Sequence, residues 1–153
     1  MPDLPLSIRP AIHTDIDTLI HLLKILFTIE EDFVFNETLQ RQGLELMLGN
    51  ERGCVLAAEM NGHVVGMCSG QITISTAEGG PALLVEDVVV QQEYRGQGIG
   101  RRLMKDIAEW SKTNGVLRLQ LLADRNNTSA LEFYNRLGWQ ATDLICLRKL
   151  PAQ

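Results

Sequence analysis

The stretch that decides the fold is Val85-Glu86-Asp87-Val88-Val89-Val90, followed by Gln91-Gln92-Glu93-Tyr94-Arg95-Gly96-Gln97-Gly98-Ile99-Gly100-Arg101. Its first half is a near-continuous apolar run, which is typical of a central strand. Its second half is rich in arginine and glycine and leads directly into a helix whose apolar residues recur at helical spacing. Alternate glycines allow positive φ and close approach of a ligand to the backbone. The unpaired N–H groups of the helix start predict an anion site, with Arg95 and Arg101 adding charge for a diphosphate.

Working outward, hydrophobic periodicity predicts an element order of β-α-α-β-β-β-α-β-α-β. The strands are expected over residues 7–10, 54–59, 63–75, 82–90, 116–123 and 144–149. The helices are expected from a capping box at Thr14, over 37–48, from Ile99 to an Asn114-Gly115 stop, and over 128–137. Strand–helix alternation appears only in the second half. The pattern therefore predicts an α/β fold with a mixed central sheet, antiparallel in its N-terminal half and parallel in its C-terminal half, flanked by about four helices.

Composition narrows the class of protein. The chain has 153 residues, 45% hydrophobic and 22% charged, which predicts one globular domain over 1–153. A net charge of −5 argues against nucleic acid or an anionic membrane as partner. There is no apolar run of the roughly 18 residues that a membrane helix needs, and Met1 is not followed by a basic and then apolar leader. We therefore expect a cytoplasmic protein.

Three cysteines, Cys54, Cys68 and Cys146, form no CxxC motif or Cys/His cluster, so no metal site is expected. An Asn61-Gly62 hairpin turn would place Cys68 opposite Val55. Cys54 would then point to the other sheet face, which predicts unbridged thiols.

The glycine spacing discriminates among phosphate ligands. Gly96, Gly98 and Gly100 do not fit the Gly-x-Gly-x-x-Gly of dinucleotide sites, and no Gly-Lys-Ser/Thr follows as in a P-loop. Without further matches, an ordinary glycine-rich turn before a helix remains the alternative.

Further matches are present. Arg95-Gly96-Gln97-Gly98-Ile99-Gly100 resembles the Arg/Gln-x-x-Gly-x-Gly/Ala signature of the GNAT superfamily of N-acetyltransferases. Asn127-x-x-Ala130-x-x-Phe133-Tyr134-x-x-x-Gly138-Trp139 is similar to the family's second segment, and Ile8-Arg9-Pro10-Ala11 to its usual opening. The residues around Val85-Glu86-Asp87 and the Asn127/Tyr134 spacing also resemble the spermidine/spermine acetyltransferase branch.

The resemblance implies acetyl-CoA as cofactor and a role for each matching position. The backbone of Val88, Val89 and Val90 would pair with the pantetheine arm. Backbone N–H groups of the signature would hold the diphosphate, from Gly96, Gln97, Gly98, Ile99, Gly100 and Arg101. Asn127 would contact the cofactor near its pantetheine, with Ala130 on the same helix turn. Tyr134 would protonate the departing thiolate, and Glu86 would act as general base on the acceptor amine.

Physical reasoning also favours a carboxylate here as base. A carboxylate on an apolar strand is partly desolvated, which raises its pKa toward the working range. Strand alternation points Glu86 and Asp87 to opposite faces and favours Glu86, but a bulge would exchange the two.

The acceptor is expected to be a small molecule with a primary amine, such as a diamine. An acidic segment, Glu30-Glu31-Asp32, would attract an ammonium group toward Glu86, and Phe33 and Phe35 would supply apolar walls. A protein or peptide amine, or a non-catalytic acyl-CoA-binding module, remains an alternative. The resemblance also implies a possible homodimer, although only a short segment follows Trp139, where the family often has a hairpin.

Overall fold

The structure is a computed structural model that describes residues 6–30 and 32–152. The chain divides into two compact units, Met1–Leu121 and Leu122–Gln153, which are treated separately below. The single domain over 1–153 stays a prediction. Within the described residues, no helix is both long and apolar enough to cross a bilayer.

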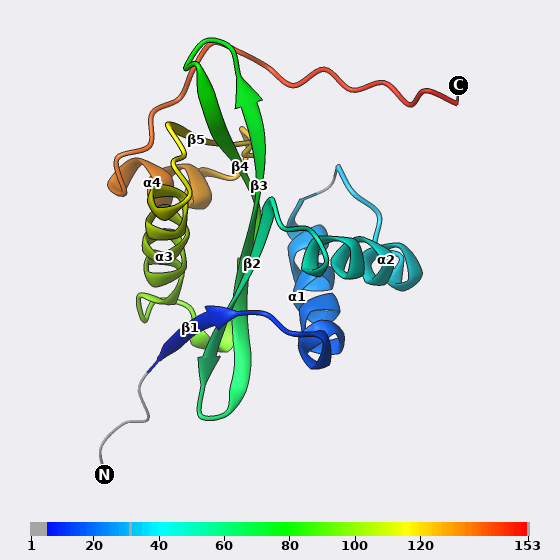
Figure 1. The fold of residues 1–153 in the computed structure, drawn as a ribbon. Coiled ribbons are helices and arrows are strands. Elements are labelled where there is room, and N and C mark those ends of the chain that lie inside the picture. The colour runs from blue at the N-terminus through cyan, green and yellow to red at the C-terminus, as the bar shows by residue number, and fades with distance from the viewer. Residues whose placement is uncertain (1–5, 31, 153) are drawn as a thin grey trace. The chain divides into compact units, whose positions relative to one another are not determined.

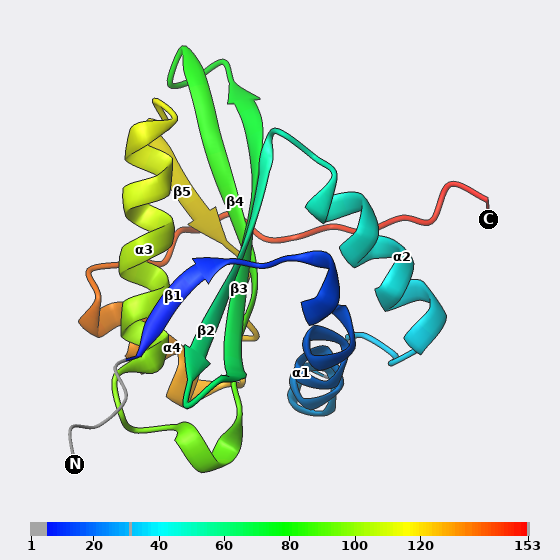
Figure 2. The same ribbon diagram turned by 60° about the horizontal axis from the view of Figure 1, so that its bottom comes forward.

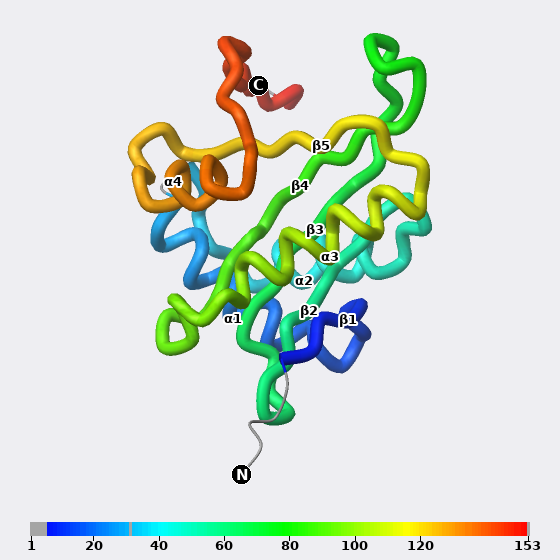
Figure 3. Tube along the Cα trace, turned by 90° about the vertical axis from the view of Figure 1, so that its left-hand side faces the viewer, coloured from blue at the N-terminus to red at the C-terminus, as the bar shows by residue number. Residues whose placement is uncertain are grey.

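The first unit is built on a five-stranded sheet in the order β1-β2-β3-β4-β5 (Figures 1 and 3). Its strands are β1 (Ser7–Pro10), β2 (Gly53–Met60), β3 (His63–Ser75), β4 (Gly80–Val90) and β5 (Arg118–Leu121). The first four strands pair antiparallel, and β4 pairs with β5 parallel. The predicted mixed sheet is confirmed, since the change of direction falls between the two halves of the chain.

Helices cover both faces of this sheet (Figure 2). One face carries α1 (Ile16–Ile29) and α2 (Glu37–Leu48), and the other carries α3 (Ile99–Thr113). Leu19 and Leu22 of α1 pack with Ala57 and Met67 of the sheet in one buried cluster. On the α3 side, Leu103 and Ile107 are fully buried because the apolar stripe predicted from the sequence faces the sheet.

A glycine sets how closely α3 approaches the sheet. A β-carbon at Gly70 of β3 would lie 2.9 Å from Leu83 Cδ2 and 3.1 Å from Ile107 Cδ1. Both distances are shorter than normal van der Waals contact, so a β-carbon here would require the ends of these two side chains to shift. Gly70 therefore leaves room for the Ile107 side chain of α3 to lie directly over β3.

The β2–β3 hairpin turns at Asn61-Gly62 as predicted, with φ of 55° and 79°. However, Ala58 pairs with Gly66 while Glu59 pairs with Val64, so Val65 is one extra residue in β3. Cys68 consequently faces Leu56 and not Val55, and shares a sheet face with Cys54. The expectation that these cysteines point to opposite faces is therefore wrong, although both thiols are unbridged.

An ion-paired arginine joins β1 to the start of α1. Arg9 donates to both Asp15 oxygens, at 2.7 and 3.0 Å, and its Nε lies 3.3 Å from Glu59. Asp15 Oδ2 also accepts the Ile12 N–H, at 2.8 Å, in a short 3-10 turn (His13–Asp15) that precedes α1. The capping carboxylate is thus Asp15, and the predicted capping role of Thr14 is wrong.

The second unit contains α4 (Thr128–Arg136), which begins and ends within one residue of the prediction. After it, the described residues up to 152 form no strand. The strand expected over 144–149 is therefore absent from this structure, and its apolar side chains are exposed.

Candidate active site

The predicted anion-binding loop lies between β4 and α3. After Val90 comes a 3-10 turn, Gln92–Tyr94, and Gly98 is the N-cap of α3 with φ of 82°. Gly96 also has positive φ, at 79°. No side chain caps the helix and no acidic residue stands in its first turn, so the positive end of the helix dipole faces the loop unopposed.

Two residues of this loop differ from the sequence expectation. Gly100 is the second residue of α3, so its backbone is helical and not in the left-handed region. Arg95 donates from Nε to the carbonyl of Val90, at 2.9 Å, and so ties the loop to the end of β4. Gln97 and Arg101 are exposed, Ile99 is buried, and Arg101 lies in the first turn of the helix.

Beside this loop, one edge of β4 has no partner strand over half of its length. Pairing with β5 begins at Ala82 and ends where Val85 faces Leu121. Val88, Val89 and Val90 lie beyond that last pair, while on the other edge Val89 and Val90 still pair with β3. Apart from the Val90 carbonyl, which accepts from Arg95, the backbone N–H and C=O groups that point to this edge can pair with an extended ligand as an added strand.

A β-bulge follows immediately after the last β4–β5 pair. Ser69 of β3 faces Glu86 and Met67 faces Val89, so two β4 residues, Asp87 and Val88, stand opposite one. Asp87 has φ of 54°, a left-handed conformation that is uncommon outside glycine but tolerated by aspartate. The bulge that the sequence left open as an alternative is therefore present.

The bulge brings two carboxylates to adjacent, different environments. Burial raises the pKa of Glu86, whose side chain remains exposed. Burial, then the charge of Glu86, raises the pKa of Asp87 to about 6, while Ser69 opposes the shift. The Ser69 hydroxyl lies 3.4 Å from Asp87 Oδ2 and 3.2 Å from the Glu86 carbonyl. Sequence reasoning missed Ser69, which only the register across the bulge identifies.

The second unit holds the remaining expected cofactor and acid residues. Asn127 is the N-cap of α4, and its side-chain oxygen accepts the Ala130 N–H at 3.1 Å. Tyr134 is half-buried on α4, with ring centroids 5.2 Å from Phe133 and 6.0 Å from Trp139. An aromatic cluster thus orients the tyrosine ring within this unit.

The acidic segment follows α1. Glu30 is the C-cap of α1, and Glu31 lies outside the described residues. Phe33 is 41% exposed and packs against Phe27, with ring centroids 5.4 Å apart. Phe35 lies under the Lys24 ammonium, 5.7 Å from the ring centroid, so this ring already has a cation on its face.

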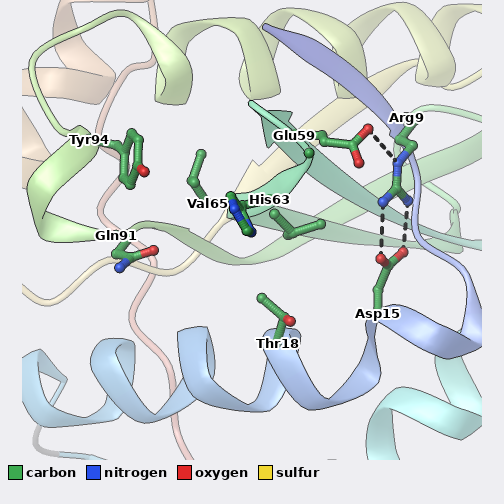
Figure 4. Close-up of a pocket in the computed structure, with 10 residues that line it drawn as sticks. Arg9, Asp15, Thr18, Glu59, His63, Val65, Gln91 and Tyr94 are labelled. Atoms are coloured by element: carbon green, nitrogen blue, oxygen red, sulfur yellow. Dashed lines mark hydrogen bonds and ion pairs between the residues drawn. The ribbon is translucent and has the colours of Figure 1, made fainter.

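An open cavity of about 450 Å³ lies at the end of β3 nearest the loop (Figure 4). Arg9, Asp15 and Glu59 line one side of it, and Gln91 and Tyr94 line the other. The ion pairs within its wall join β1, β2 and the start of α1, so these charges hold the fold together. Of the residues expected from the sequence to bind cofactor or acceptor, none that the structure describes lines this cavity.

Comparison with known proteins places these features in context. A family model described as Acetyltransferase (GNAT) family matches residues 17–139. That range includes the bulge, the glycine loop and the Asn127–Trp139 segment.

Several relatives of the chain are named as N-acetyltransferases. Glucosamine 6-phosphate N-acetyltransferase of Trypanosoma brucei brucei is 35% identical over 57% of this chain and 58% of its own. Thialysine N-epsilon-acetyltransferase of Bos taurus is 39% identical over 40% of this chain and 36% of its own. The chain thus spans less than two thirds of the length of these relatives. A predicted acetyltransferase from Clostridium acetobutylicum, solved with acetyl-CoA, has the same fold, with a TM-score of 0.80, 18% identity, and coverage of 97% of this chain and 99% of that one.

Proposed function

Since the chain belongs to the acetyltransferase (GNAT) family, we propose that it transfers an acetyl group from acetyl-CoA to a primary amine of a small molecule, by direct attack in a ternary complex. One observation carries the proposal. The bulge with its two carboxylates, the unpaired edge of β4 and the uncapped start of α3 follow one another along a single strand–loop–helix segment. That order supplies, in sequence, a base, a site for an extended arm and an anion site.

Acetyl-CoA, the cofactor of this family, fits the loop in charge and conformation. Backbone N–H groups from Gly96 to Arg101 bind the diphosphate, because the helix start offers free donors and a positive dipole end. The backbone of Val88–Val90 holds the pantetheine arm as an added strand. Arg95 acts through its bond to the Val90 carbonyl, which fixes the loop, more than as a direct phosphate ligand. The family resemblance also implies cofactor contacts for Asn127 and Ala130, which lie in the second unit.

The general base is one of the two bulge carboxylates. Glu86 is the base expected from strand alternation, and its exposed side chain suits contact with an entering amine. Asp87 has the pKa nearer neutrality, at about 6, and a left-handed backbone that tilts it out of the strand pattern. We retain Glu86 as the base and place Asp87 beside it as the more strongly shifted carboxylate, whose pKa is raised by burial and by the charge of Glu86.

Tyr134 is the general acid of this proposal. Its aromatic neighbours Phe133 and Trp139 hold the ring, which leaves the hydroxyl as the chemically active group. Protonation of the departing CoA thiolate by a phenol completes the proton balance, since the base removes one proton from the amine.

The acceptor is proposed to be a cationic amine of small size, such as a diamine. The proposed entrance for the acceptor is acidic and partly apolar. It includes Glu30 at the end of α1 and the partly exposed ring of Phe33. The names of the trypanosomal and bovine relatives specify amines of small molecules, which supports a small-molecule amine as acceptor. A cytoplasmic location belongs to the same proposal and is supported by the free thiols of Cys54, Cys68 and Cys146.

The test is a panel of amines with acetyl-CoA, followed by release of CoA thiol. Diamines and amino sugars are expected to turn over, and CoA is expected to raise the melting temperature where NADH and ATP do not. Turnover with peptides alone would indicate a protein or peptide acceptor. CoA binding without turnover of any amine would indicate a non-catalytic acyl-CoA-binding module.

A further inference from the structure

The β-bulge of β4 has a buried hydroxyl opposite it. Ser69 of β3 faces Glu86 in the strand register and is 4% exposed. Its Oγ lies 3.2 Å from the Glu86 carbonyl oxygen and 3.4 Å from Asp87 Oδ2. Because water is almost excluded from this position, the hydroxyl depends on these two oxygens for its hydrogen bonds.

The Ser69 hydroxyl can serve both protonation states of Asp87. A serine hydroxyl carries one hydrogen and can also accept, whereas an ionised carboxylate can only accept. When Asp87 is ionised, a hydrogen bond from Ser69 to its charge is stronger than one to the neutral Glu86 carbonyl. When Asp87 is protonated, its own O–H can donate to Ser69 Oγ, and the serine hydrogen can rotate to the carbonyl. Neither state therefore leaves a buried oxygen without a hydrogen bond.

The same hydroxyl also fixes the backbone of the bulge. The Glu86 carbonyl belongs to the peptide group that precedes Asp87, whose φ is 54°. A residue in this left-handed region keeps its conformation only where its surroundings hold it. Ser69 contacts the bulge from β3 on both sides of that φ angle, at the peptide group before it and at the side chain after it. A change in the protonation of Asp87 can therefore occur without a change in the bulge.

The charges near Asp87 make Ser69 the contact that favours its ionised form. Burial first, and then the charge of Glu86, raise the pKa of Asp87 to about 6, whereas the hydrogen bond from Ser69 acts in the opposite direction. The charge of Asp87 also reaches the thiol of Cys68 on β3. Burial is the largest cause that raises the pKa of this thiol, and Asp106 of α3 adds to it, so Cys68 stays neutral where Asp87 titrates.

We propose that Ser69 is a positioning residue, whose hydroxyl holds Asp87 in its ionised form beside Glu86 and rotates to the Glu86 carbonyl when Asp87 takes up a proton. The inference rests on the proposed function, in which Glu86 receives a proton from the acceptor amine. A negative charge on Asp87 makes that transfer more favourable, because protonation of Glu86 relieves the repulsion between the two carboxylates. The proton moves from the amine nitrogen to a Glu86 oxygen, and no covalent bond of Ser69 changes.

The dependence of the acetylation rate on pH tests this role. Ser69→Ala should move the acid limb of the profile from about pH 6 upward by about one pH unit, the lower end for loss of a hydrogen bond to a charged group, and the rate should recover at higher pH. Ser69→Thr keeps a hydroxyl and should retain the original limb.

Ser75→Ala is the matched control, because Ser75 also lies on β3, is 8% exposed, and accepts the Glu78 N–H at 3.1 Å. It should leave the limb unchanged. If Ser69→Ala lowered the rate by the same factor at every pH, the hydroxyl would only support the fold, and the proposal would be overturned.

A second measurement needs no turnover. NMR of the side-chain carboxyl carbons in the intact chain follows the protonation of Asp87 directly, with Asp87→Asn used to assign its signal. Asp87 should titrate near pH 6 in the wild type and in Ser69→Thr, and about one pH unit higher in Ser69→Ala. Equal titration in the wild type and Ser69→Ala would overturn the inference even if the protein acetylates amines. A shifted titration in a chain that acetylates no amine would instead refute the proposed function and leave the contact between Ser69 and Asp87 established.

Discussion

Replacing Gly98 tests whether the loop before α3 binds CoA or is only a turn. Gly98 has φ of 82°, and no heavy atom lies within 4 Å of where a β-carbon would be. The β-carbon of Gly98→Val therefore meets no steric clash within the protein, and the expected cost is the backbone strain of a β-branched residue at positive φ. That strain is about 1–3 kcal/mol. For a chain of this size it corresponds to a fall in melting temperature of about 2–12 °C.

The decisive measurement is the shift in melting temperature on adding CoA. At about 100 times its dissociation constant, a ligand adds about 2.7 kcal/mol of stability. Gly98→Val should abolish this gain, because the side chain occupies the space where the diphosphate meets the backbone. Gly79→Val is the matched control, since Gly79 has φ of 74° and equally open surroundings in the β3–β4 turn. It should lose similar intrinsic stability but keep the CoA shift. An undiminished CoA shift in folded Gly98→Val would refute the cofactor assignment.

Five further substitutions give distinct readouts. Glu86→Gln should lower the rate by about 10²–10⁴, and activity should rise through about pH 6 as Asp87 loses its proton, a limb that Asp87→Asn should remove; a rate retained in both variants would point to another base. Tyr134→Phe should keep CoA affinity and lower kcat over the same range of about 10²–10⁴, and a fall below about threefold would leave Tyr134 with packing alone. Asp15→Asn should cost about 1–3 kcal/mol at neutral pH. Because Arg9 lowers the pKa of Asp15, that stabilisation should be full above the unfolded pKa and disappear as the pH falls below about 4, and a wild-type minus variant difference independent of pH would contradict this. Glu30→Gln should raise KM for diamines about two- to fivefold, equivalent to about 0.4–1 kcal/mol, with added salt reproducing the change; diamine kinetics insensitive to both would rule out steering.

Elements with local signals could be predicted from the sequence. The bounds of β3 and α2 match the expected ranges, because a turn at Asn61-Gly62 and a glycine stop at Gly49 mark them. The glycine loop and the helix that follows it were also identified, since arginine, glycine and an apolar stripe occur in a fixed order. These features depend on residues that are close together in the sequence, so the sequence of one chain is enough to predict them.

Features that depend on register could not be read in this way. Val65 and Asp87 each add one residue to one strand of a pair. A valine and an aspartate are ordinary strand and strand-end residues, so neither residue type reveals that a bulge is present. The first bulge moved Cys68 from Val55 to Leu56, and the second placed Ser69 against Asp87. Bulges arise from how strands fit across the sheet, so a periodicity of two fails at the residue where they occur.

The expected strand over 144–149 is a case in which the sequence pattern predicts an element that the structure does not contain. Its pattern is that of a strand, but a strand requires an edge to pair with, and the sequence does not say which edge or whose. The sequence pattern indicates that Leu144 and its neighbours can form a strand. In the described structure they pair with no strand and their apolar side chains are exposed.

The contact of α3 with β3 at Gly70 is connected through the helix to the anion-binding loop at the start of α3. Ile107, which rests over Gly70, stands eight residues from Ile99 at the helix start, a distance of about 12 Å along the axis. A methyl group at position 70 would require the ends of the Leu83 and Ile107 side chains to move. If α3 moved with Ile107, the displacement would be transmitted along the helix to the N–H groups at its start. Substitutions at Gly70 would therefore be subject to selection on cofactor binding by the loop before α3, even though Gly70 lies outside that loop. Deep mutational selection for altered CoA affinity should recover position 70 alongside the loop itself.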